Sequence, residues 1–145
     1  MIDTALIRKK LGELETYIIT LERLRSHSLK ELLEDRAKAW SVEHGLQIAV
    51  QTVIDTGNNI LAALGEQEIE DYVDVIDKLG ERGIIPPAFS QSIRGMAGFR
   101  NILVHEYAAV DLKKVYHVLH NQLDDFREFA KHIDAYLATQ TKKES

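Results

Sequence analysis

Residues 100–107 read Arg-Asn-Ile-Leu-Val-His-Glu-Tyr and lie near the end of an apolar segment that follows Pro86-Pro87. On a regular helix each residue turns by about 100°, so Arg100 shares a face with Tyr107 and with apolar residues of the same segment. These apolar residues are Phe89, Ile93, Met96 and Leu103. A guanidinium on an apolar face must be paired or must face a polar cleft, because burying it alone is costly.

His105 follows Arg100 by five residues and would point about 140° away from it on a regular helix. For the two side chains to act at one site, the helix must bend or fray near His105. Otherwise the arginine of one chain must meet the histidine of another. The spacing therefore indicates a composite site.

Arginine and histidine together suit the metal-free cleavage of RNA. A histidine can remove the 2′-hydroxyl proton because its reference pKa of about 6.5 lies near the working pH. The planar guanidinium of an arginine can hold two phosphate oxygens and stabilise a phosphorane. The structural alternative is that Arg100 pairs with a carboxylate and that His105 caps a helix end.

The order of Arg, a polar Asn, three further residues, His, one residue and Tyr resembles the signature of the HEPN superfamily. From about Asp3 to about Leu137 the chain resembles the HepT-like branch, the toxin half of HEPN/MNT toxin–antitoxin pairs. This resemblance implies a homodimeric, metal-independent endoribonuclease of a type VII-like toxin–antitoxin system. It implies that Arg100 binds phosphate, that His105 acts as base or acid, and that Asn101 assists.

The resemblance also implies that the motifs of two subunits face each other across a dimer cleft. Tyr107 would then be the residue that an MNT nucleotidyltransferase modifies with AMP. The expected partners are RNA, this antitoxin and a second copy of the chain, with no cofactor, metal, DNA or membrane. Two alternatives stay open: a noncatalytic helical module that binds a nucleotide or a protein in the cleft, and a purely structural dimerisation bundle.

Length, charge and cysteine content restrict these possibilities. With 145 residues, the chain is expected to form one HEPN domain over residues 1–138, followed by a polar tail over 139–145. Cysteine is absent, which excludes a disulfide framework and a thiol nucleophile and is compatible with the cytoplasm. The net charge of −5, from 18 basic and 23 acidic residues, argues against a nonspecific nucleic-acid coat but allows a local cationic cleft. No signal peptide or membrane span is expected.

Apolar periodicity predicts an all-α, antiparallel bundle of about five helices. The expected helices cover residues 3–25, 29–64, 71–79, a motif helix that starts at Pro86-Pro87, and 112–137. Ser41 and Gly45 suggest a kink or an interruption in the second helix. Ser28 and Asp111 are expected to cap helices, and Gly65 to end one.

Three further patterns have a possible functional role. Gly57, Asn58 and Asn59 are poor helix formers, so they are expected to permit a close helix approach or to line a cleft. Gly95 and Gly98 suggest tight packing, with the same helix of a second subunit as a candidate neighbour. His117 and His120, with Asp124, share the spacing of a metal site, although such residues on a charged helix are more often solvated.

Overall fold

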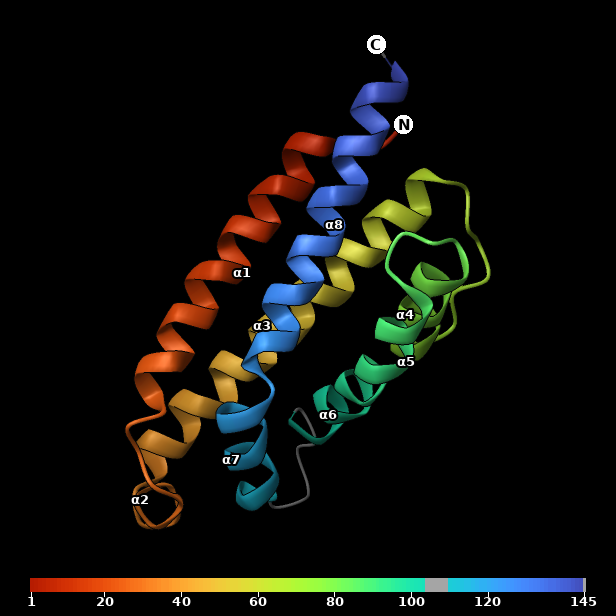
Figure 1. Cartoon of the computed structure of the whole chain (residues 1–145). Coiled ribbons are helices and arrows are strands. Elements are labelled where there is room, and N and C mark those ends of the chain that lie inside the picture. The colour runs from red at the N-terminus through yellow and green to blue at the C-terminus, as the bar shows by residue number, and fades with distance from the viewer. Residues whose placement is uncertain (104–109, 145) are drawn as a thin grey trace.

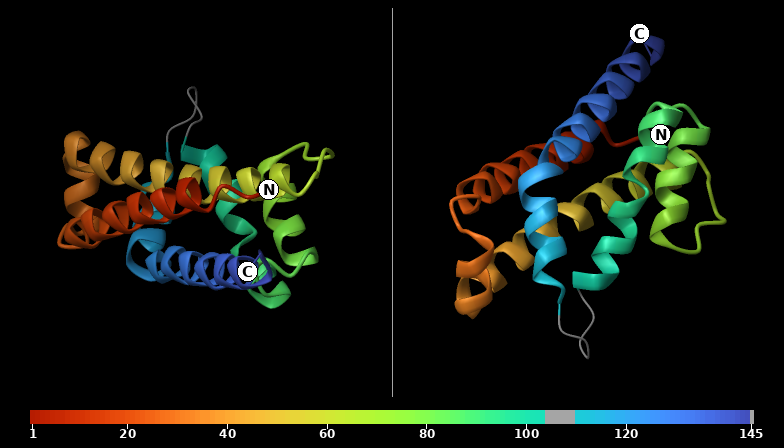
Figure 2. Two further views of the ribbon diagram at one scale, coloured as in Figure 1. Left: turned by 90° about the horizontal axis from the view of Figure 1, so that it is seen from above. Right: turned by 60° about the horizontal axis from the view of Figure 1, so that its bottom comes forward.

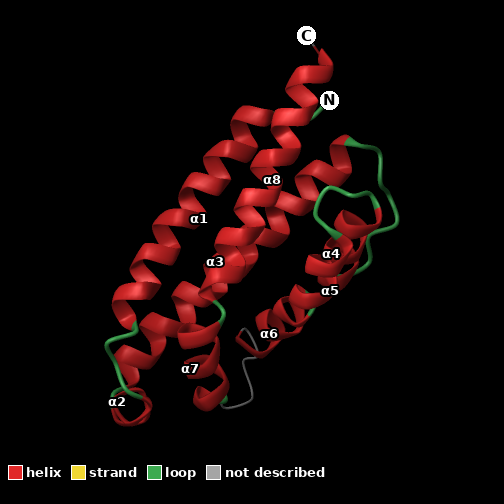
Figure 3. Cartoon of the chain, in the orientation of Figure 1, coloured by secondary structure: helices red, strands yellow, loops and turns green. Residues whose placement is uncertain are grey.

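The computed structural model describes residues 1–103 and 110–144, and the side chains of residues 1–103 and 110–140. Within this part the chain forms eight α-helices and no strand (Figure 3), so the predicted all-α class is confirmed. The helices are α1 (Thr4–Leu24), α2 (Leu29–Glu34), α3 (Arg36–Ala63), α4 (Tyr72–Glu81), α5 (Pro87–Ile93), α6 (Gly95–Leu103), α7 (Leu112–Asn121) and α8 (Leu123–Glu144). None of these helices combines the length and the apolarity needed to cross a lipid bilayer.

The long helix α3 is the centre of the bundle. It packs against α1, α2, α4, α6, α7 and α8. Figure 1 shows α1 on one side of α3 and α4 to α6 on the other. Its buried apolar residues are Ala39, Val42, Leu46, Ala49, Val50, Val53, Ile54, Ile60 and Leu61. This continuous apolar surface explains why one helix can hold both halves of the fold together.

Helices α1 and α8 run antiparallel and side by side, as both views in Figure 2 show. The seam of α1, made of apolar residues that recur every three or four positions, is buried within the chain at Ile7, Leu14, Ile18 and Leu21, while Leu11 is half-buried. On the surface, Arg127 of α8 donates hydrogen bonds to the carboxylates of Glu15 and Glu22 on α1. The seam therefore needs no second subunit to cover it.

Helix breaks occur at other places than the sequence predicted. Helix α3 runs continuously past Ser41 and Gly45, so the interruption considered there is not present. The break lies earlier, at Asp35, whose carboxylate accepts from the backbone N–H groups of Ala37 and Lys38 and so caps α3. The predicted caps at Ser28 and Asp111 are confirmed.

Two further predicted helices are each divided in two, and with the break at Asp35 this gives eight helices where about five were expected. The segment after Pro86-Pro87 breaks at Arg94, just before Gly95, and the last helical segment breaks at Gln122. Glycine disfavours a continuous helix by about 1 kcal/mol relative to alanine, which weakens the helix at the first of these breaks. The last helix is also longer than predicted, because α8 continues beyond Leu137 through the polar residues to Glu144.

Glycines bring α3, α4 and α5 into close contact. A Cβ atom built on Gly57 of α3 would lie 2.8 Å from side-chain atoms of Leu79 and Val75 on α4, so the predicted close approach is confirmed. A Cβ on Gly80 of α4 would lie 2.6 Å from the Cβ of Ser90 on α5. By contrast, nothing lies within 4 Å of a Cβ at Gly95 or Gly98, so the expected tight packing there is not present within the described chain.

We predict that Gly80→Ala lowers the free energy of unfolding by about 1–3 kcal/mol, because the new methyl group meets the Cβ of Ser90 rather than a mobile side-chain end. Ser90 cannot move away easily, since it is buried and its hydroxyl donates to the carbonyl of Ile76. The matched control is Gly12→Ala on α1, where nothing lies within 4 Å. That variant should gain up to about 1 kcal/mol from helix propensity. Urea unfolding measures both, and a Gly80→Ala protein as stable as the wild type would contradict the packing described here.

Candidate functional site

Arg100 lies on α6 among apolar residues and is half-buried. Its Nε donates a hydrogen bond of 3.2 Å to Oε1 of Gln51 on α3. The central carbon of its guanidinium lies 4.6 Å from the ring centroid of Tyr72 on α4, a cation–π contact. The expectation that this guanidinium is paired is therefore confirmed. The alternative of a carboxylate partner is wrong for the described residues, none of which forms an ion pair with it.

Gln51 links Arg100 to a carboxylate one helical turn away. Its amide Nε2 donates to Oδ1 of Asp55 at 2.9 Å. A guanidinium can only donate and a carboxylate can only accept, so the amide oxygen must face Arg100 and the amide nitrogen must face Asp55. The two hydrogen bonds fix the orientation of Gln51, and Gln51 in turn fixes Arg100.

The two terminal nitrogens of Arg100 have no hydrogen-bond acceptor among the described residues, because its one described hydrogen bond uses Nε. Those nitrogens form the edge of the guanidinium that holds two oxygens of a phosphate or a carboxylate. The guanidinium of Arg100 is thus held at Nε by Gln51 and on one face by Tyr72. The edge formed by its two terminal nitrogens remains available to an anion.

Two hollows lie on either side of Tyr72 and share Glu70, Asp71 and Tyr72 as a common wall. One has a volume of about 310 Å³ and is also lined by Gln51, Asp55 and Asn58 of α3. The other has a volume of about 370 Å³ and is also lined by Val73, Ala97 and Asn101. The expectation that the Gly57–Asn59 stretch lines a cleft is confirmed for Asn58, whereas Asn59 lines neither hollow; both side chains are exposed.

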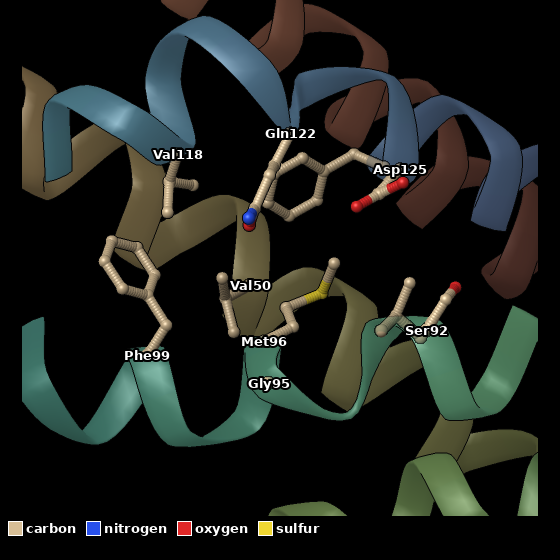
Figure 4. Close-up of a pocket in the computed structure, with 10 residues that line it drawn as sticks. Val50, Ser92, Gly95, Met96, Phe99, Val118, Gln122 and Asp125 are labelled. Atoms are coloured by element: carbon tan, nitrogen blue, oxygen red, sulfur yellow. The ribbon is translucent and has the colours of Figure 1, made fainter. Parts of the chain in front are cut away.

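A third and more enclosed cavity of about 110 Å³ lies between α3, α6 and the junction of α7 and α8. In Figure 4, Val50, Met96, Phe99 and Val118 form its apolar walls, and Gln122 and Asp125 approach from the α7–α8 side. Burial raises the pKa of the Asp125 carboxyl, and the nearby Glu128 and Asp124 carboxylates add to this shift. This cavity shares no lining residue with the hollows beside Tyr72. It is therefore separate from them and results from the packing of α6 against its neighbouring helices.

The histidine pair on α7 does not form the metal site considered from the sequence. Nδ1 of His117 lies 3.2 Å from the amide nitrogen of Asn121, and the ring of His120 packs against Tyr116 at 4.1 Å between centroids. The described part of the chain contains no group of three His, Cys, Asp or Glu residues that could hold a metal ion. His117 is thus bonded locally, whereas His120 is packed against an aromatic ring and its buried Nε2 has no hydrogen-bond partner among the described residues.

Of the four site residues predicted from the sequence, the structure describes two. Arg100 and Asn101 lie next to each other on α6, with Asn101 exposed and lining the second hollow. His105 and Tyr107 lie outside the described residues. Sequence reasoning missed Gln51 and Tyr72 as partners of Arg100, and it missed Asp55 as the partner of Gln51. A glutamine and an aspartate four residues apart on a helix could have indicated their mutual contact, but not the contact of the glutamine with a residue 49 positions away.

Comparisons of the sequence and of the fold with known proteins indicate the same family. The family model described as "Ribonuclease HepT-like" matches residues 14–133. The chain is 27% identical to the "tRNA nuclease HepT" of Aphanizomenon flos-aquae over 138 residues, which cover 95% of this chain and 94% of the relative. It is 32% identical to the "mRNA nuclease HepT" of Shewanella oneidensis over 95 residues, which cover 66% of this chain and 71% of the relative.

The fold is also similar to that of a solved toxin structure. The tri-AMPylated HEPN toxin of Shewanella oneidensis, in complex with MNT antitoxin, superposes with a TM-score of 0.81 at 27% identity. The similarity covers 93% of this chain and 99% of that toxin. The likeness therefore extends over almost the full length of both chains.

We predict that the Nε–H proton of Arg100 exchanges slowly with water and that Gln51→Leu speeds this exchange by about tenfold or more, because a hydrogen bond to a charged group is lost. Nitrogen-15 NMR of the arginine Nε–H groups measures both rates. Arg94 is an internal control, since its Nε donates to Asp77 at 2.8 Å and should be unaffected. An Arg100 signal that does not change in Gln51→Leu would show that Gln51 does not hold the guanidinium.

Proposed function

The chain belongs to the HepT-like ribonuclease family, and we propose that it is the toxin of a type VII-like toxin–antitoxin pair that cleaves RNA without a metal ion. The observation that carries this proposal is the setting of Arg100: it is held by Gln51 and Tyr72, and its terminal edge is open to an anion. Cellular RNA as the substrate places this activity in the cytoplasm.

The proposed reaction uses two side chains of the motif. His105 takes the proton of a ribose 2′-hydroxyl, and the 2′-oxygen attacks the adjacent phosphorus. The bond from phosphorus to the 5′-oxygen breaks, and that oxygen leaves as a hydroxyl with a proton that the protonated His105 or water supplies. Arg100 stabilises the additional negative charge on the phosphorane through its terminal nitrogens. The products are a 2′,3′-cyclic phosphate and a 5′-hydroxyl, and Asn101 assists by orienting the phosphate or the imidazole.

A second copy of the chain would complete this site. On a regular helix His105 and Arg100 face directions about 140° apart, so a homodimer in which two motifs meet resolves the geometry. The structure supports this proposal in one respect: Gly95 and Gly98 are exposed on α6 and have no neighbour within 4 Å of a Cβ position. A helix from a second copy could therefore approach α6 closely at these residues.

The proposed control of the toxin is modification of Tyr107 by an MNT nucleotidyltransferase. The tri-AMPylated state of the Shewanella oneidensis toxin, in complex with its MNT antitoxin, supports this proposal. An AMP group on Tyr107 would bring a phosphate near the motif. It could pair with the open edge of Arg100 and repel the RNA backbone, as added phosphate groups do elsewhere.

We predict that His105→Ala lowers the rate of RNA cleavage by about 100- to 10,000-fold, the usual contribution of a general acid–base group. The assay uses a mixed RNA pool with unmodified protein in EDTA. His117→Ala is the matched control, because His117 is exposed on α7 and bonds locally to Asn121. Equal cleavage by His105→Ala and the wild type would reject the catalytic role. Binding of RNA without any cleavage by the wild type would favour the noncatalytic binding module.

We predict that incubation with the cognate MNT protein and ATP increases the mass of the chain by one or more AMP units and abolishes cleavage. Tyr107→Phe should keep its original mass and its activity, because it lacks the acceptor oxygen. Tyr17→Phe is the control, since this half-buried tyrosine of α1 is remote in sequence from the motif. A Tyr107→Phe protein that still gains the AMP mass would place the acceptor elsewhere.

A further inference from the structure

The hollow of about 310 Å³ beside Tyr72 is lined by apolar, aromatic and polar side chains. Ile54, Ile69 and Val75 supply apolar surface, Tyr72 supplies the ring, and Asp55, Asn58, Glu70 and Asp71 supply polar groups. Its volume lies at the lower end of the range of small-molecule sites. Three carboxylates make it unsuitable for a phosphate, although Arg100, the proposed phosphate ligand, contacts both Gln51 and Tyr72 on its wall.

These carboxylates differ in what they are free to bind. Asp55 already accepts from Gln51, and Asp71 accepts from the backbone N–H of Asp74 as the cap of α4. The carboxylate of Glu70 has no hydrogen-bond or ion-pair partner among the described residues, and neither has the side-chain amide of Asn58. Glu70 thus offers two acceptor oxygens, and Asn58 offers a donor, to an occupant of the hollow.

We propose that this hollow holds the base of a nucleotide next to the phosphate on Arg100, and that guanine is the base it prefers. Single-stranded RNA is commonly recognised by stacking of bases on aromatic side chains and by hydrogen bonds to their Watson–Crick edges. Guanine alone among the four bases presents two adjacent donors, N1–H and N2–H, which match the two oxygens of a carboxylate. Its O6 oxygen accepts from an amide such as that of Asn58. Uracil and cytosine lack this donor pair, and adenine has only its amino group.

The proposal gives separate roles to the groups around Tyr72. It rests on the proposed ribonuclease function. Arg100 covers one face of the ring and binds the phosphate, while Asn101 lines the hollow on the other side of the shared wall. The base lies beside the carboxylates, which select it through hydrogen bonds. Their negative charge repels the RNA backbone, so the phosphate stays near the guanidinium of Arg100. Stacking on Tyr72 adds binding that does not depend on base identity.

The first test measures nucleotide binding without cleavage, on the full-length His105→Ala protein in EDTA. Guanosine, inosine and uridine 5′-monophosphates are titrated while NMR follows the side-chain amide of Asn58. Inosine lacks only the N2 amino group. A good bidentate contact discriminates by about 5- to 150-fold, so guanosine monophosphate should bind at least about fivefold more tightly than the other two. Equal affinity for the three nucleotides would overturn the proposal.

The second test uses Glu70→Gln, which removes one charge and one of the two equivalent acceptors. This variant should lose the preference for guanosine monophosphate. Glu68→Gln is the matched control: it removes the same charge from the same exposed connector, and Glu68 does not line this hollow. If Glu68→Gln loses the preference equally, general charge rather than a contact with the base is responsible, and the proposal fails.

Sequencing of fragment ends from the RNA pool separates this inference from the proposed function. Wild-type cleavage enriched in guanosine at one fixed position, and lost in Glu70→Gln, supports both. Efficient cleavage with no base preference leaves the ribonuclease function intact and overturns the guanine site. Selective binding of guanosine monophosphate by a protein that cleaves no RNA supports the site and overturns the function.

Discussion

A guanidinium on the apolar face of α6 is the constraint that arranges the surrounding residues. Arg100 cannot be half-buried there without partners, and its partners come from two other helices: an amide oxygen from α3 and an aromatic face from α4. Both are neutral, so they hold the side chain without neutralising its charge. A carboxylate in either place would have competed with any anion that the arginine binds. The same contacts therefore stabilise the fold and preserve the positive charge for chemistry.

The meeting of these three helices depends on close packing elsewhere in the bundle. Gly57 allows α4 to lie close to α3, where a methyl group would require the side-chain ends of Leu79 and Val75 to shift. Gly80 allows α5 to lie against α4, where a methyl group would meet the Cβ of Ser90. Together they place Tyr72, at the first residue of α4, beside Gln51 in the middle of α3 and Arg100 on α6. The glycines are far from the motif in sequence, yet they determine where the partners of its arginine lie.

Local signals in the sequence predicted the elements well, and the reason is physical. Helix caps such as Ser28 and Asp111 act within three residues, and apolar periodicity reports which face of each helix is buried. The breaks at Arg94 and Gln122 were missed because local propensity there is weak and the packing of neighbouring helices decides. For the site, the need to pair Arg100 was predictable from its apolar face. Its actual partner, Gln51, was not, because a contact between residues 49 positions apart leaves no pattern in a single sequence. The roles of His105, Asn101 and Tyr107 stay predictions.

The account depends most on the claim that RNA is cleaved through its own 2′-oxygen, with Arg100 at the phosphate. The most direct measurement is the chemistry of the fragment ends after unmodified protein has acted on RNA in EDTA. The account predicts a 2′,3′-cyclic phosphate on one fragment and a 5′-hydroxyl on the other. It also predicts that a 2′-deoxy substitution at the cleaved nucleotide blocks the reaction. A 3′-hydroxyl paired with a 5′-phosphate would contradict it, because those ends require attack by water and a different mechanism.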